Sequence, residues 1–166
     1  MKRPEEGEMP PVRIRVAVPE DASALADLAG ELGYPVAASG MKARLEEVEG
    51  DLHHGVFVAD AGSVAGWVHV AQVLSLESGT YAEIRGLVVG RAYRRSGIGR
   101  RLVAAAEEWA RCTECFRIRV RTNVVRDDAR QFYSRLGYAV SKTQEVFDKP
   151  LASDPGMSKT VVDPGV

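Results

Sequence analysis

The sequence predicts one α/β domain with a central mixed β-sheet flanked by helices. Two kinds of apolar periodicity support this prediction. Runs that alternate apolar and polar residues are typical of half-buried strands, and apolar residues at helical spacing are typical of amphipathic helices. These runs follow one another in the order β-α-α-β-β-β-α-β-α-β. In addition, a glycine-bearing loop separates a strand run from an amphipathic helix, an arrangement that suits a layered α/β fold.

The elements of the N-terminal half are defined by alternation and by helix-terminating residues. Glu20 and Asp21 favour a helix start, and Gly33 favours its end, because glycine readily adopts the left-handed conformation that closes a helix. A turn sequence at 60–63 joins two apolar runs into a hairpin. The predicted elements are a strand at 12–18, helices at 19–33 and 40–48, and hairpin strands at 56–59 and 64–74.

The C-terminal half continues the alternation of strands and helices. An apolar helical face begins at Ile98 and reaches Ala110, with charged residues on the other side. A second apolar stripe begins after Asp127-Asp128 and is closed by Gly137. The predicted elements are strands at 80–89, 116–121 and 138–147, and helices at 98–110 and 129–136.

The composition is that of a soluble globular protein, with 45% hydrophobic residues, 27% charged residues and a formal net charge of −1. A near-neutral chain has no general attraction for nucleic acid or for an anionic membrane, so neither partner is expected. No stretch approaches the roughly 20 apolar residues of a membrane span, and residues 1–8 do not resemble a signal peptide. The expected location is therefore the cytoplasm. The expected organisation is a flexible arm at 1–11, one domain at 12–149 and a mobile tail at 150–166.

The loop Arg94-Arg95-Ser96-Gly97-Ile98-Gly99 is the most informative functional feature of the sequence. Its glycines allow a ligand to approach the backbone closely, and the N-terminus of the following helix attracts anions. Arginines at 94, 95, 100 and 101 add guanidinium groups, which suit phosphate oxygens. A Walker nucleotide loop is absent from the sequence, and Leu102 stands where a dinucleotide fold has its third glycine. We therefore interpret the loop as a pyrophosphate cradle.

The spacing Arg94-x-x-Gly97-x-Gly99 resembles the coenzyme A signature of the GNAT superfamily of acetyl-CoA-dependent N-acetyltransferases. Residues 83–89 resemble the central strand of that family, and Asn123, followed by Ala129 and 132–138, resembles its second conserved block. Asn123 lies six residues before Ala129. This spacer is longer than the commoner form and resembles that of some small-amine acetyltransferases, including the aminoalkylphosphonate group. The resemblance covers residues 12–148 and implies a GNAT-like acyl-CoA N-acyltransferase fold.

The resemblance also implies roles for individual residues. Glu83, which lies 11 residues before Arg94, is similar to the strand glutamate that serves as general base, and Tyr133 is similar to the tyrosine that gives a proton to the coenzyme thiolate. In the family the strand splays near Gly86, so that backbone groups at 87–89 pair with the pantetheine amides and the acetyl carbonyl. The residues expected to bind the coenzyme are Leu87, Val88, Val89, Arg94, Arg95, Ser96, Gly97, Ile98, Gly99, Arg100 and Asn123.

Each of these residues also has an ordinary structural explanation. Glu83 can simply pair with a charge such as Arg85, and Tyr133 can pack in a core with its hydroxyl hydrogen-bonded. Asn123 can cap the helix that follows it. Gly86 favours a bulge or a close approach, and the alternative is a glycine tolerated on a crowded face.

Two groups of basic side chains are interpreted as structural. His53-His54 is expected on the surface, and His69 is expected to be hydrogen-bonded, with a position in a substrate cleft as the alternative. Arg117, Arg119 and Arg121 are expected to form a solvated strand face, because no aromatic residues interleave them as in a nucleic-acid site.

The expected co-substrate is acetyl-CoA, and no metal is expected. Cys112 and Cys115 would need two further ligands to hold a metal ion, and histidines are few in the chain. The pair also lies where a helix gives way to a strand, whereas a redox motif normally sits at a helix start. Two reduced cysteines are the expected state.

These expectations combine into an N-acetyltransferase that moves an acetyl group from acetyl-CoA to a primary amine by direct attack, with a small molecule as the expected acceptor. The alternative is an acyl-CoA-binding sensor or partner subunit that uses the same cradle with weak or no catalysis. No motif identifies the amine, although 33–45, the hairpin around 67–75 and the final strands are expected to build its site. A homodimer through the last strands is compatible with the pattern but not required by it.

Overall fold

The computed structural model describes residues 11–152, so the predicted arm at 1–11 and tail at 150–166 lie almost entirely outside the described residues. The chain divides into two compact units, Met1–Thr122 and Asn123–Val166, according to which residues contact one another. In the described residues, the first unit contains the β-sheet and the helices α1 to α3, and the second contains the helix α4.

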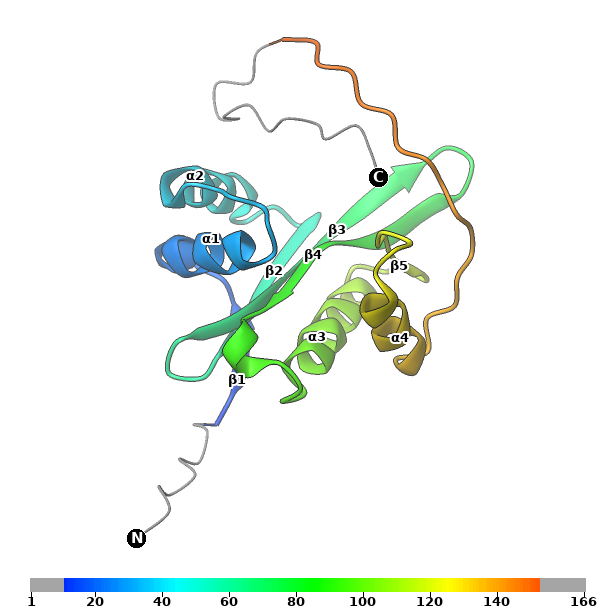
Figure 1. The fold of residues 1–166 in the computed structure, drawn as a ribbon. Coiled ribbons are helices and arrows are strands. Elements are labelled where there is room, and N and C mark those ends of the chain that lie inside the picture. Colours follow the sequence, from blue (N-terminus) through cyan, green and yellow to red (C-terminus); the bar gives the residue numbers. More distant parts are fainter. Residues whose placement is uncertain (1–10, 153–166) are drawn as a thin grey trace, which may run out of the picture. The chain divides into compact units, whose positions relative to one another are not determined.

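The first unit is built on a five-stranded sheet whose strands lie side by side in chain order (Figure 1). The pairings from β1 to β4 are antiparallel, and the last pairing, between β4 and β5, is parallel. The sheet is therefore mixed, as predicted. Its strands are β1 (Arg13–Val16), β2 (His54–Asp60), β3 (Val64–Ser75), β4 (Gly79–Val89) and β5 (Ile118–Val120).

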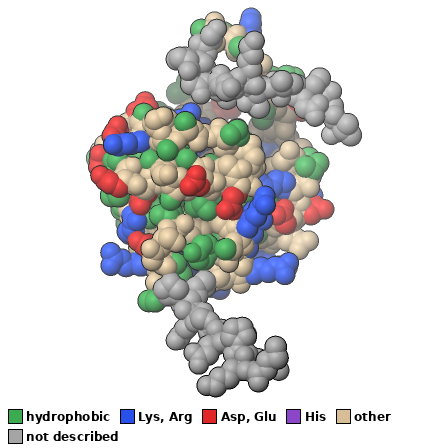
Figure 2. Space-filling view, turned by 60° about the vertical axis from the view of Figure 1, so that its left-hand side comes forward, with side chains coloured by type: hydrophobic (Ala, Val, Ile, Leu, Met, Phe, Trp, Pro, Cys, Tyr) green, Lys and Arg blue, Asp and Glu red, His purple; other side chains and the backbone are tan. Residues whose placement is uncertain are grey.

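One face of the sheet is covered by α1 (Ala22–Glu31) and α2 (Ala38–Val48) (Figure 1). Leu25 of α1 and Leu45 of α2 belong to one buried cluster with Val58 of β2. Figure 2 brings this side forward and shows acidic and basic side chains interspersed with hydrophobic ones. This face therefore carries no uniform charge.

The opposite face of the sheet is covered by α3 (Ile98–Cys112). Two strand glycines allow the helix to approach closely. A Cβ atom at Gly55 would lie 2.9 Å from the Trp109 ring, and one at Gly66 would lie 3.2 Å from Leu102 Cδ1. The apolar helical face predicted from Ile98 to Ala110 is buried against the sheet, as expected.

A partly buried ion pair between Arg15 and Asp21 fixes the start of α1. One turn of 3-10 helix, η1 (Pro19–Asp21), precedes it. The Asp21 carboxylate accepts the backbone N–H of Val18 at 2.9 Å and two guanidinium N–H groups of Arg15, each at 2.8 Å. These Arg15 bonds hold the pKa of Asp21 below its ordinary value. The predicted acidic helix start is confirmed, and its carboxylate ties the helix to the strand before it.

In the second unit, α4 (Asp127–Arg135) confirms the last predicted helix, and Gly137 follows it at φ +89°. The strand predicted at 138–147 is wrong, because residues 138–150 form neither helix nor strand. A strand needs a neighbour for its backbone hydrogen bonds, and the polar run at 141–145 has no apolar face to bury. Val146 and Phe147 are correspondingly exposed.

Candidate functional site

The loop before α3 has an uncommon backbone conformation. It follows one turn of 3-10 helix, η2 (Arg91–Tyr93), and contains two left-handed residues, Arg95 at φ +63° and Gly97 at φ +81°. Left-handed backbone is uncommon for residues other than glycine, and such conformations cluster at ligand sites. Ser96 Oγ donates a hydrogen bond to the Tyr93 carbonyl, which fastens the turn.

The N-terminus of α3 opens onto this loop. Gly97 is the N-cap residue, and no side chain caps the first turn. The Gly97 carbonyl accepts the Arg101 N–H at 3.2 Å, so the N–H groups of the three residues between them have no partner within the helix. A Cβ atom at Gly97 would meet no atom within 4 Å. Free N–H groups at a helix start, beside left-handed residues, form a site for an anion.

The arginines of the predicted cradle lie around this helix start. Arg94, Arg95 and Arg100 are exposed, whereas Ile98 is buried and anchors the helix to the core. Arg94 Nε donates to the carbonyl of Val89 at 3.5 Å, so the loop lies against the end of β4. The arrangement can hold a multiply charged anion with both backbone and guanidinium donors.

β4 has a free edge that leads to this loop. β5 pairs only with Ala82–Ile84 of β4, so Arg85–Val89 has β3 on one side and no strand on the other among the described residues. Val88 is buried, and Leu87 and Val89 are half-buried. The outer N–H and C=O groups of this segment can therefore pair with an extended ligand in the manner of an added strand.

The free edge begins at a β-bulge. On β3 and β4, Val70 faces Ile84 and His69 faces Gly86, which leaves Arg85 as the extra residue. The bulge predicted at Gly86 is confirmed, and so is the close approach, because a Cβ atom there would lie 2.8 Å from the Trp67 ring. Trp67 Nε1 is buried without a hydrogen-bond partner in the described part of the chain.

Glu83 is buried in the paired part of β4, with 3% of its surface exposed. Its Oε1 accepts an N–H of Arg85, and its Oε2 accepts the Nε–H of Arg121 at 3.2 Å. The charge pair considered as the structural explanation is therefore present. Because both carboxylate oxygens already accept guanidinium donors, an amine that uses Glu83 as a base must displace one of them or act through a water molecule.

Arg117 and Arg121 are exposed, as predicted for a solvated face, but the three arginines at β5 also contact buried residues of β4. Arg119 Nη1 donates to the hydroxyl of Tyr81 at 3.1 Å, and the guanidinium carbons of Arg117 and Arg119 lie 4.9 and 4.4 Å from the centre of the Tyr81 ring. Arg121 pairs with Glu83. The aromatic partner that β5 lacks in its own sequence comes from β4, and matching the period-2 faces of the two strands could have found it.

His54 and His69 form a hydrogen-bonded pair on neighbouring strands. Nδ1 of His54 lies 2.9 Å from Nε2 of His69, and the rings stack with centres 5.2 Å apart. The hydrogen bond expected for His69 is confirmed, whereas His54 is half-buried and not on the surface as predicted. Burial, together with repulsion from His54 and Arg85, lowers the pKa of His69 to about 4. An uncharged imidazole therefore adjoins the bulge at Gly86 at neutral pH.

Asn123 and Tyr133 belong to the second unit. Asn123 Oδ1 accepts the N–H of Val125 at 3.2 Å, within the turn that precedes α4. The half-buried ring of Tyr133 has its centre 5.0 Å from that of Phe132 and 5.5 Å from that of Tyr138. Burial raises the pKa of the Tyr133 hydroxyl to about 12. The hydroxyl keeps its proton at neutral pH and can donate it to a base that forms nearby.

Among the described residues, the cysteines form no metal site or disulfide. Cys112 is exposed and Cys115 is buried, and both are free thiols. Within residues 11–152, no group of three or more His, Cys, Asp or Glu side chains is placed to hold a metal ion. In the same range, no helix has both the length and the apolar character needed to cross a membrane.

Comparison with known sequences gives an independent result. Residues 23–138 match the model of the acetyltransferase (GNAT) family. An aminoalkylphosphonate N-acetyltransferase of Salmonella typhimurium is 31% identical over 147 residues, which are 85% of this chain and 94% of the relative. An aminoglycoside N(6′)-acetyltransferase type 1 of Serratia marcescens is 27% identical over 116 residues, which are 66% of this chain and 80% of the relative.

Solved structures share the fold. A transcriptional regulator from Bacillus halodurans C-125 is 29% identical, with a TM-score of 0.73 over 84% of this chain and 100% of its own. AAC(6′)-Iy, in complex with the bisubstrate analogue CoA-S-monomethyl-acetylneamine, is 19% identical, with a TM-score of 0.73 over 84% of this chain and 99% of its own. With 19% identity, the similarity to AAC(6′)-Iy shows a shared fold and nothing more. The predicted fold class is confirmed.

Proposed function

This chain belongs to the GNAT acetyltransferase family and is an acyltransferase, and from that premise we propose that it moves an acetyl group from acetyl-CoA to a primary amine of a small molecule. The amine nitrogen attacks the thioester carbonyl carbon directly. A C–N bond forms, the C–S bond breaks, and the products are an amide and coenzyme A. The reaction needs a proton acceptor for the amine, donors for the carbonyl oxygen and a proton for the departing thiolate.

The main support for this proposal is that the free edge of β4 leads directly to the loop at 94–97. The N–H groups of the first turn of α3 and the exposed side chains of Arg94, Arg95 and Arg100 would hold the pyrophosphate. The outer backbone groups of residues 87–89 would pair with the pantetheine arm, which is long, extended and rich in amides. The binding of a coenzyme A-linked analogue to AAC(6′)-Iy, which shares the fold, supports this assignment.

Two side chains would carry the proton transfers. Glu83 would accept the amine proton, through a water molecule or after exchange of one guanidinium partner. Tyr133, whose raised pKa keeps it protonated, would donate to the thiolate. Asn123 would donate its amide N–H groups to the pantetheine arm, because its Oδ1 accepts a hydrogen bond from the following turn. The backbone N–H groups at 87–89 would stabilise the developing oxyanion.

Coenzyme binding and turnover test the proposal separately. Isothermal titration with acetyl-CoA should give one tight site, with ATP and NAD binding far more weakly. Thiol release should then appear with part of a panel of small primary amines and be absent without amine. Binding with no thiol release from any amine would instead support a coenzyme-binding subunit without catalysis, and absence of binding would refute the cradle.

A further inference from the structure

Four arginines gather around two buried residues at the β4–β5 junction. Glu83 holds two of them and Tyr81 holds the other two, through a hydrogen bond and through the face of its ring. Tyr81 and Glu83 are only 4% and 3% exposed. We call the four side chains the β4–β5 arginine cluster: Arg85, Arg117, Arg119 and Arg121.

The cluster carries more positive charge than its partners neutralise. Glu83 is the one carboxylate within salt-bridge distance of these arginines in residues 11–152. Tyr81 offers only a neutral ring and hydroxyl. Four guanidinium groups therefore face one carboxylate, which leaves a net charge of +3 on one side of the sheet. The four positive charges repel one another, so a bound anion would stabilise the arrangement.

The anchored arginines retain donors for a ligand. A guanidinium group has five N–H donors, and the bonds to Glu83 and Tyr81 use one donor each from Arg85, Arg119 and Arg121. The side chains of Arg85 and Arg121 are 52% and 58% exposed, so they contact a buried anchor and also reach solvent. Because the anchors fix the guanidinium groups in advance, little side-chain entropy is lost on binding an oxyanion.

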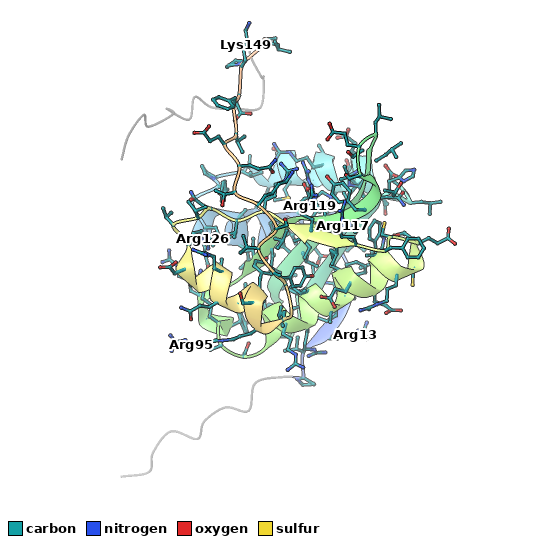
Figure 3. All side chains as sticks on the ribbon, turned by 90° about the vertical axis from the view of Figure 1, so that its right-hand side faces the viewer. Arg13, Arg95, Arg117, Arg119, Arg126 and Lys149 are labelled. Carbon is teal, nitrogen blue, oxygen red and sulfur yellow. The ribbon has the colours of Figure 1, made fainter. Side chains whose placement is uncertain are left out.

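The cluster lies at the opening of the free β4 edge. The paired segment of β4 and β5 ends at Ile84 and Val120, so Arg85 and Arg121 are the first residues beyond it. Figure 3 shows Arg119 of β5 and Arg117, which directly precedes this strand, well apart from Arg95 of the pyrophosphate loop. An anion bound by the cluster would therefore lie near the proposed thioester and away from the proposed coenzyme phosphates.

We propose that the acceptor is a primary amine that also carries an oxyanion group, and that the β4–β5 arginine cluster binds this group. Phosphonates, phosphate esters and carboxylates share the required chemistry, since each presents anionic oxygens to guanidinium donors. A polycationic amine meets like charge at the same place and is disfavoured. This inference rests on the proposed function, because it names the substrate class of that site.

Matched short amines test the substrate class. The probes are 2-aminoethylphosphonate, β-alanine, neutral ethanolamine and the polycation spermidine, compared by kcat/KM for thiol release. At least one anionic amine should exceed ethanolamine by about 10- to 100-fold, which corresponds to about one charge-assisted contact. The two anionic probes distinguish a phosphorus oxyanion from a carboxylate, and spermidine should be the poorest acceptor.

Variants assign the effect to the cluster. Combining Arg117→Gln with Arg119→Gln should lower the anionic-to-neutral ratio of kcat/KM by about 10- to 100-fold. Tyr81→Phe keeps the ring but removes the hydroxyl that holds Arg119, so it should lower the ratio by a smaller factor. Arg13→Gln is the matched control, because Arg13 is an exposed arginine of β1 that lies apart from the cluster in Figure 3. It should leave the ratio unchanged.

Direct binding keeps the test independent of turnover. Titration of 2-aminoethylphosphonate and β-alanine into protein loaded with coenzyme A should show binding that the double variant weakens about 10- to 100-fold. Active enzyme with equal kcat/KM for ethanolamine and both anionic amines would overturn the inference and leave the proposed function standing. An equal loss of acetyl-CoA affinity in the double variant would assign the cluster to the coenzyme and also overturn it. Lack of thiol release from every amine would count against the function, while the titration would still decide the anion site.

Discussion

Replacing Gly97 by valine perturbs the proposed coenzyme cradle at its centre. Gly97 lies at φ +81°, where a side chain costs roughly 1–2 kcal/mol and a β-branched residue is an outlier. A Cβ atom there meets nothing within 4 Å, so this backbone strain is the main expected cost to the folded state. The free energy of unfolding should fall by about 1–2 kcal/mol, which lowers Tm by about 2–8 °C for a chain of this size.

Coenzyme affinity should fall much further than stability. The valine side chain would fill the open space beside the first N–H groups of α3, where the pyrophosphate is proposed to bind. A charge-assisted hydrogen bond contributes roughly 1.5–3 kcal/mol, and displacement of the anion removes at least two of them. The Kd for coenzyme A should therefore rise by about 10²–10⁴-fold.

The assay is isothermal titration of coenzyme A, paired with thermal unfolding of the same sample. Gly62→Val is the matched control. Gly62 lies at φ +87° in the turn between β2 and β3, and a Cβ atom there also meets nothing within 4 Å. It should cost similar stability and leave the Kd unchanged. A folded Gly97→Val protein with the coenzyme affinity of the parent would refute the cradle.

Three further predictions concern proton transfer and pH. Tyr133→Phe should lower kcat by about 10²–10⁴-fold with little change in acetyl-CoA affinity, measured under conditions where chemistry limits turnover; unchanged kcat would leave Tyr133 as a packing residue. Glu83→Gln should lower kcat over a similar range, and its unfolding free energy should fall by roughly 1.5–3 kcal/mol, because a buried carboxylate that accepts two guanidinium donors is lost. Urea unfolding at several pH values should detect the effect of His69 protonation on stability. Its pKa of about 4 lies below the ordinary value near 6.5, so the unfolded chain binds the proton more readily. Stability should therefore fall as the pH drops from about 6.5 to 4, by at most about 1.4 kcal/mol per pH unit, and His69→Gln should remove this part of the slope.

Local signals in the sequence were enough for most of the fold. The apolar face of α3, the hairpin of β2 and β3 and the helix start at Ile98 depend on residues close together in the chain, and each is observed. The bulge at Gly86 was also predictable, because glycine within a β-rich run is itself a local signal.

Contacts between distant segments account for the errors. The alternation at 138–147 looked like a strand, but a strand forms only where a partner offers its edge. The contact of the basic face at β5 with Tyr81 was missed, because this aromatic partner lies in another strand. His54 looked like a surface residue because the stacking of His69 against it depends on the register of β2 and β3. Periodicity along a single segment contains none of this pairing information.

Glu83 links the proposed chemistry to the proposed choice of substrate. Its two oxygens accept donors from Arg85 and Arg121, and both arginines also belong to the cluster that would bind the anionic group of the acceptor. An oxyanion that binds there takes N–H donors of these arginines that Glu83 does not use. The same two guanidinium groups would then hold both the anionic group of the acceptor and the carboxylate that receives its amine proton. An acceptor with an anionic group would therefore be positioned beside its general base, whereas a neutral amine would lack this contact.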